Sequence, residues 1–295
     1  MSLTAQQLEM RRHGIGGSEI AAVLGLSKFR GPWDVWLSKR HGVDQAANVD
    51  MERGTFLEPA LIQWYLARTL KKAAMSAGTV KHARNAIALC TPDLMALDAG
   101  GIGRLVSIKA PRGGWDWGPE GTDEVPEEYL VQQQWEHAIC ASFMPVGSLD
   151  STMDLAALVD GQLRIYPVEA DLEVQGWLLE SATEWWRRHI IEGVEPELDD
   201  GSGARAWLRR KYRGKGGTVR QATPQEMALL LALRDAKERV VDAEKQLETA
   251  TRNIEDAIGE DAGVEADGIG RVTWKRDKND VRVMRMKWPK ERTQQ

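Results

Sequence analysis

Asp93 and Lys109 are the residues whose types and spacing most clearly suggest chemistry. Asp93 follows an apolar run that begins at Ile87, and Lys109 ends a second apolar run that begins at Leu105, with three glycines between the runs. Such glycines supply the positive φ angles that a hairpin connection needs, so we predict a β-hairpin over residues 87–111. The hairpin would bring a carboxylate and an ammonium to one side of a sheet. An oxygen ligand for a cation and a positive charge are two requirements of Mg²⁺-dependent phosphodiester cleavage.

Two predicted helices would add further polar side chains to this site. One opens near Glu52 and continues with apolar residues at helical spacing, which places Glu58 on its first turn. The other begins at Pro126 and carries Glu128, Gln132 and Glu136. These three residues are each one helical turn apart, so they share a face.

A glycine-rich loop near the N-terminus predicts an anion site. Gly14, Gly16 and Gly17 precede Ser18, and an apolar segment follows. A helix that starts at Ser18 would direct unpaired N–H groups and its positive dipole end at the loop. A plain turn with a capping serine is the simpler interpretation of these residues alone.

Taken together, these segments resemble a known family. The order of Asp93, the hairpin and Lys109 resembles the PD-(D/E)xK nucleases, and residues 12–25 followed by 32–36 resemble the opening of the YqaJ-type phage recombination exonucleases, which are lambda exonuclease-like. The resemblance implies an α/β fold with a central mixed sheet flanked by helices. It also implies Mg²⁺, replaceable by Mn²⁺, held by Asp93, Glu58 and the backbone carbonyl of Ile108. Lys109 would then assist the attacking water, with Gln132 beside it.

The same resemblance assigns a pocket for the 5′-phosphate of DNA. Arg12 and Ser18 would line it, with Thr91 in the place of a family serine. We choose Arg12 over Arg11 because the Arg-x-Gly pattern falls on Arg12.

Ser107 departs from the family pattern, because it stands where the family has a metal-binding Glu. A neutral hydroxyl binds Mg²⁺ poorly. Three explanations stay open: Glu128 or Glu136 supplies a relocated acid, as in a group of restriction enzymes with Ser-x-Lys; the protein grips DNA ends without cleaving them; or Ser107 is an introduced substitution.

Composition predicts one large domain with an appendage. Hydrophobic residues make up 42% and charged residues 28% of the 295, which is ordinary for a globular protein. We expect a nuclease domain over residues 1–198. Residues 199–295 would form a basic linker, a long helix with a heptad of apolar residues starting at Leu233, and a terminal β-hairpin.

The net charge of −5 gives no global attraction to phosphate, so DNA contacts must come from local basic clusters. The two cysteines lie in apolar contexts, and neither a signal peptide nor a membrane-spanning run appears, which favours the cytoplasm and no membrane partner.

The function implied by the resemblance is digestion of one strand of duplex DNA from a 5′-phosphorylated end. The 3′ strand would pass to a single-strand annealing protein, in the host cell of a phage or prophage, and the enzyme could form a trimer. The alternative is an end-binding or regulatory module with impaired catalysis.

Overall fold

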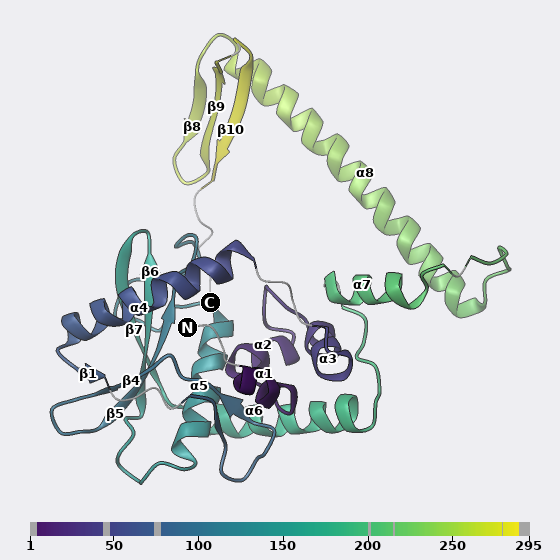
Figure 1. Cartoon of the computed structure of the whole chain (residues 1–295). Coiled ribbons are helices and arrows are strands. Elements are labelled where there is room, and N and C mark those ends of the chain that lie inside the picture. Colours follow the sequence, from purple (N-terminus) through teal and green to yellow (C-terminus); the bar gives the residue numbers. More distant parts are fainter. Residues whose placement is uncertain are drawn as a thin grey trace. The chain divides into compact units, whose positions relative to one another are not determined.

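The computed structural model describes residues 5–43, 48–73, 78–199, 202–214, 216–278 and 280–288. Contacts divide the chain into two units, Met1–Gly214 and Lys215–Gln295 (Figure 1). The sequence placed this boundary after residue 198. The structure places it later because α7 (Ser202–Lys211) packs with the first unit: the Trp207 ring stands edge-on to that of Trp36, 5.7 Å between centroids.

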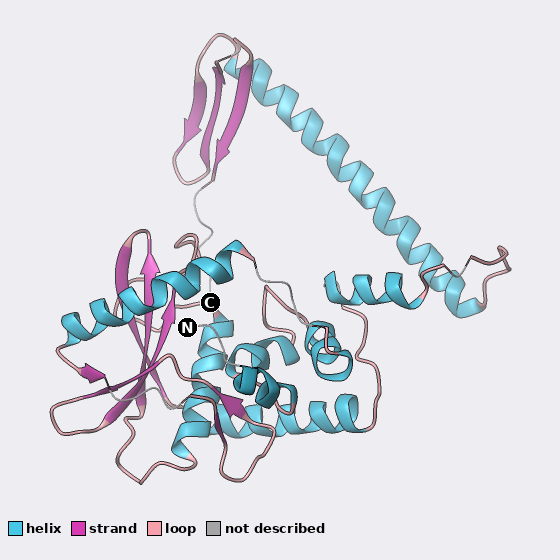
Figure 2. Cartoon of the chain, in the orientation of Figure 1, coloured by secondary structure: helices cyan, strands magenta, loops and turns pink. Residues whose placement is uncertain are grey.

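A five-stranded mixed sheet forms the centre of the first unit (Figure 2). Its strand order is β1 (Lys72–Ala73), β4 (Leu94–Leu97), β5 (Gly103–Lys109), β6 (Thr152–Val159) and β7 (Gln162–Glu169). Strands β5 and β6 run parallel, and the other neighbours are antiparallel. Strands β2 (Val80–Lys81) and β3 (Leu89–Cys90) form a separate antiparallel pair, which comes between β1 and β4 in the sequence. The predicted mixed sheet is confirmed.

The predicted hairpin is formed by β4 and β5, which pair antiparallel with Leu94 opposite Val106 and Leu97 opposite Gly103. A second hairpin, β6–β7, turns at Asp160 and Gly161, which both have positive φ. Because side chains alternate along a strand, β5 presents one set of residues to each face of the sheet.

Helices cover both faces. Helix α4 (Val49–Thr69) packs Leu61 and Tyr65 on the face that carries Val106 and Ile108. Helix α5 (Glu127–Ala141) covers the opposite face, the one that carries Leu105. The sheet therefore places residues 105, 107 and 109 on the α5 side.

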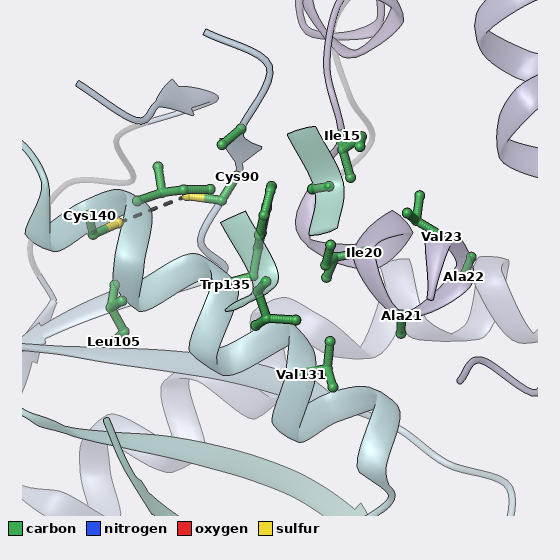
Figure 3. Packing of buried hydrophobic residues seen from close by; sticks show 14 of the residues in the cluster. Ile15, Ile20, Ala21, Ala22, Val23, Cys90, Leu105, Val131, Trp135 and Cys140 are labelled. Atoms are coloured by element: carbon green, nitrogen blue, oxygen red, sulfur yellow. Dashed lines mark hydrogen bonds between the residues drawn. The ribbon is translucent and has the colours of Figure 1, made fainter. Parts of the chain in front are cut away.

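The larger core cluster joins α5 to the N-terminal elements. Helix α5 packs with α2 (Gly17–Val23) and with α6 (Leu172–Trp185), which continues as the π-helix η1 (Trp186–Ile191). Trp135 of α5 is fully buried in this cluster (Figure 3). Its Nε1–H donates to the Leu89 carbonyl at 2.9 Å. This bond fixes α5 against the strand that leads into Asp93.

The N-terminal helices hold the glycine loop. Helices α1 (Ala5–Arg12) and α3 (Pro32–His41) flank α2 in sequence, and the Ile15 backbone pairs with Ala88 as an isolated bridge. Helix α2 begins at Gly17 and its N-cap is Gly16, so the expectation that Ser18 starts or caps this helix is wrong. The Glu19 carboxylate caps it instead, by accepting from the Gly16 N–H at 2.9 Å.

The second unit contains the predicted long helix and hairpin. Helix α8 spans Pro224–Ile258, and β8 (Gly263–Ala266), β9 (Gly270–Arg276) and β10 (Arg282–Lys287) form a three-stranded antiparallel sheet. Leu233, Val240 and Leu247 of the heptad are each more than half exposed. Among the described residues of the whole chain, no helix is long and apolar enough to cross a membrane.

Candidate active site

The hairpin brings Asp93 to the end of β5. Asp93 lies one residue before β4, and its Oδ2 accepts a hydrogen bond from the Ile108 N–H at 2.8 Å. Lys109 is the last residue of β5. The predicted closeness of the aspartate to the lysine-bearing arm is thus what the structure shows.

Gln132 on α5 continues the site from Lys109. The Lys109 Nζ donates to Gln132 Oε1 at 3.1 Å, and the Gln132 Nε2 donates to Glu136 Oε1 at 2.7 Å. The same Nζ lies 5.2 Å from the centre of the Tyr129 ring. The amide of Gln132 therefore links the ammonium on the strand to a carboxylate on the helix.

Glu136 meets Ser107 at the position of the missing acid. The Ser107 Oγ donates to Glu136 Oε2 at 3.4 Å, and the Glu136 side chain is almost fully buried. Burial raises the pKa of this carboxyl to about 7, and the nearby Asp93 charge adds to the rise. Lys109 and the hydrogen bonds from Gln132 and Ser107 act in the opposite direction.

Gly17 makes room for this carboxylate. A Cβ added at Gly17 would overlap Glu136 Oε1, although Gly17 has no positive φ. A glycine is needed here for close approach, so the first turn of α2 is packed directly on the Glu136 side chain.

Glu128, the other candidate for a relocated acid, lies elsewhere. It is also buried, about two turns from Glu136 toward the start of α5. Its Oε2 accepts from the Lys28 N–H at 3.0 Å. Of the two candidates, Glu136 is the one in contact with Ser107.

The donor set at this site fits Mg²⁺. Among the described residues no group of three or more His, Cys, Asp or Glu side chains is arranged to hold a metal ion. Mg²⁺, however, binds through one or two carboxylates and keeps several waters. Asp93 and Glu136 are close enough for one charge to raise the pKa of the other, a repulsion that a bound cation would offset.

Glu58 comes from the other side of the sheet. It is half-buried on α4, near Leu57 and Leu61, which pack on the face opposite α5. The hydrogen bonds that join Lys109, Gln132 and Glu136 lie between β5 and α5, and Asp93 bonds to the β5 backbone. The role of Glu58 as a ligand stays a prediction.

Of the two arginines that precede the glycine loop, the one in contact with Ser18 is not the one chosen on sequence. Arg11 donates from Nη2 to the Ser18 Oγ at 2.7 Å, whereas Arg12 pairs with Glu9 at 3.4 Å and is largely exposed. The motif could not distinguish the two, because adjacent helix residues point about 100° apart and the rotation of α1 selects one. Arg11 is therefore the arginine in contact with Ser18, and the phosphate-binding role of Arg12 stays a prediction.

Lys39 is buried beside the glycine-rich loop and contacts the residues that flank it. Its side chain is 2% exposed, and its Nζ donates to both oxygens of Glu19 and to the Arg11 carbonyl. Burial lowers the pKa of Lys39, and the Glu19 charge partly offsets that. No sequence motif indicates this pair, since Glu19 and Lys39 are 20 residues apart in the chain.

Thr91, the third predicted phosphate residue, is half-buried between Cys90 and Pro92. Its hydroxyl forms a 2.8 Å hydrogen bond with that of Thr79. This hydrogen bond does not connect Thr91 to Ser18, so the phosphate-binding role of Thr91 stays a prediction.

One pocket connects the two halves of the site. Its volume is about 830 Å³, and its wall includes Ser18, Ile108, Lys109 and Gln132. Lys28, Arg30 and Arg112 also line it and are paired with the carboxylates of Asp116, Glu19 and Asp50. Trp115 adds an aromatic side chain that is 67% exposed. A chain with an anionic group at Ser18 can therefore extend to Lys109 within one continuous cavity.

Comparisons with known proteins agree with this architecture. Residues 6–142 match the family model of the YqaJ-like viral recombinase domain. Over 205 residues the chain is 25% identical to uncharacterized protein YqaJ of Bacillus subtilis (strain 168), which covers 68% of this chain and 61% of that relative's length.

The fold is similar to two crystal structures of LHK-Exo, an alkaline exonuclease from Laribacter hongkongensis, one of which is in complex with dAMP. Each has 19% identity and a TM-score of 0.51, and each match covers 70% of this chain and 97% of the other. The predicted resemblance and the predicted fold are both confirmed.

Proposed function

Because residues 6–142 carry the YqaJ-like viral recombinase domain on an alkaline-exonuclease fold, we propose that this protein is a Mg²⁺-dependent DNA exonuclease of a phage-type recombination system. It digests one strand of linear duplex DNA from a 5′-phosphorylated end. The observation that carries the proposal is the linked set of Lys109, Gln132, Glu136 and Ser107, which supplies a carboxylate where the motif lacks one.

Each residue has a chemical task in this proposal. Asp93, Glu136 and the Ile108 carbonyl hold the cation, with Glu58 as a further ligand implied by the family. When bound, Mg²⁺ neutralises charge on the scissile phosphate and lowers the pKa of a water. Lys109 orients that water and offsets negative charge that develops on the phosphate. Gln132 hydrogen-bonds both the Lys109 ammonium and the Glu136 carboxylate, and so holds the two groups in position relative to each other.

Arg11 and Ser18 bind the 5′-phosphate at the end of the substrate strand. A guanidinium beside a hydroxyl offers charge-assisted hydrogen bonds to a phosphate monoester. With the 5′-phosphate at this end of the pocket and the scissile bond at Lys109, the enzyme removes the terminal nucleotides of one strand. The 3′ strand passes to a single-strand annealing protein. This work takes place in the cytoplasm of a bacterial host.

Digestion of end-labelled DNA tests the proposal. We expect a blunt, 5′-phosphorylated linear duplex to release its 5′ label as acid-soluble nucleotide with Mg²⁺ or Mn²⁺, and to stay intact with EDTA. A 3′ label should be retained until late. Binding without release would instead support the end-binding module, and release of the 3′ label first would contradict the polarity.

A further inference from the structure

The small sheet of the second unit has two chemically different faces. Strand β9 pairs with β10 so that Arg271 lies opposite Lys287, Thr273 opposite Arg285, and Lys275 opposite Val283. These positions alternate with a second set, and alternate residues of a strand point to opposite faces. The first face therefore carries four cations, which we name the basic face: Arg271, Lys275, Arg285 and Lys287.

The other face is apolar and accounts for the stability of the sheet. It carries Val264, Val272, Trp274, Met284 and Met286, of which Val272 is buried. Arg282 ties this sheet to the end of α8. Its guanidinium lies 3.9 Å from the Trp274 ring centre and donates to the carbonyls of Gly259 and Asp261. The basic face is therefore the face of this sheet that is available to bind a partner.

The four cations of the basic face are poorly neutralised by the protein. All four residues are exposed. Among the described residues only Arg271 has a carboxylate partner, Glu265 from β8. Arg271 and Lys287 are directly opposite each other, and like charges in that position destabilise a sheet. Because the chain as a whole has a net charge of −5, this local excess of positive charge does not follow from composition.

We propose that the basic face binds the phosphodiester backbone of DNA without reading its sequence. Its remaining side chains are Thr273, Val283 and Glu265, so the face offers no aromatic ring to stack on a base. Closely spaced cations on neighbouring strands suit a polymer with one charge per about 1.7 Å of its axis. The choice of DNA as the polyanion rests on the proposed function.

Salt dependence of binding by the full-length protein tests this proposal. A covalently closed duplex without ends, and a single-stranded circle of the same length, avoid the phosphate pocket, and EDTA prevents cleavage. The variant R271Q/K275Q/R285Q/K287Q is compared with R234Q/K237Q/R239Q/K245Q, which removes the same charge from the exposed surface of α8.

We expect the slope of log K against log salt to fall by about 3 to 4 for duplex in the basic-face variant, since each phosphate contact contributes about 0.9. The α8 variant should change the slope by less than about 1. A fall of about 3 with the single strand alone, at about 0.7 per contact, would assign the face to the displaced strand. The smaller variant K275Q/R285Q should give about half the loss, which keeps the test valid if the fourfold variant fails to fold.

Several results would overturn the proposal. Equal slopes in the two fourfold variants would show that only total charge matters. Aggregation of the basic-face variant with an unchanged slope would mean that the cations only keep the sheet edge from pairing with other chains. Competition by polyglutamate as effective as by DNA would indicate an acidic protein partner. Digestion of linear DNA is measured separately, so a loss of slope without any digestion would contradict the proposed function but not this one.

Discussion

Glu136 is the residue on which the account of catalysis depends. It reaches the position of the missing strand acid from a helix, and its buried carboxyl is held by Ser107 and Gln132. In the function that we propose, α5 and not β5 would therefore supply this part of the metal-binding charge. This arrangement explains how a chain with Ser107 can keep two carboxylates beside Lys109.

Moving the acid back to the strand is the first prediction at this scale. Ser107→Glu alone should lower exonuclease activity, because another carboxylate would crowd Glu136, whose pKa is already raised by burial and by Asp93. S107E/E136Q should regain activity relative to E136Q by about tenfold or more. If S107E alone gave a large gain, Glu136 would not be the working acid.

The two arginines at the end of α1 give the second prediction. Arg11→Ala should reduce the preference for a 5′-phosphate over a 5′-hydroxyl by about 10- to 100-fold, as expected for a hydrogen bond to a charged group worth about 1.5–3 kcal/mol. Arg12→Ala is the matched control, since Arg12 pairs with Glu9. Digestion rates on both substrates measure the effect. Loss of the preference in R12A alone would restore the sequence-based choice.

At the scale of elements, α5 and the β4–β5 hairpin were predictable and the contacts between elements were not. The hairpin followed from alternating apolar residues and glycines, and the face of Glu128, Gln132 and Glu136 followed from helical spacing. Which of those glutamates meets Ser107 depends on how α5 packs on the sheet. The boundary after Gly214 depends likewise on Trp207 reaching Trp36, residues far apart in the chain.

The contact between α2 and α3 gives a stability prediction. Lys39→Met would leave the buried Glu19 carboxylate without its closest cation, which typically costs about 3–5 kcal/mol. Urea unfolding should show this loss in the free energy of unfolding. E19Q/K39M should recover part of it, because no buried charge remains. A neutral effect of K39M would mean that Arg30, 3.8 Å from Glu19, suffices to stabilise the carboxylate.

A glycine at the start of α2 gives a prediction about the site itself. Gly17→Ala should lower activity at least tenfold, because its methyl group would displace the Glu136 carboxylate. Gly54→Ala is the control, since a Cβ there meets open space on the pocket wall. Digestion of linear duplex measures both, and equal activity of the two variants would contradict the close packing described above.

In the whole molecule, the two units have different roles in the function that we propose. The first unit holds the site and the matched family domain, and the second carries the exposed apolar heptad of α8 and the basic face. The second unit has no sequence motif that predicts a role for it. Its basic face could be identified only once the strand register showed which residues lie together.

The trimer implied by the family resemblance is a prediction at this scale. Native mass spectrometry should give the mass of three chains. If the heptad of α8 makes the contact, L233E/L247E should shift the protein to monomer, because charges at these positions cannot pack against another helix. A monomeric wild-type protein would contradict the trimer.

Release of nucleotides from a 5′-phosphorylated linear duplex by the wild type, E136Q and E128Q is the most direct test of the central claim. The account predicts Mg²⁺-dependent digestion by the wild type and by E128Q within about tenfold. E136Q should lose about 100-fold or more, as when a group that stabilises the transition state is removed. Full activity of E136Q, or none in the wild type with either Mg²⁺ or Mn²⁺, would contradict the claim that Glu136 replaces the missing acid of a working nuclease.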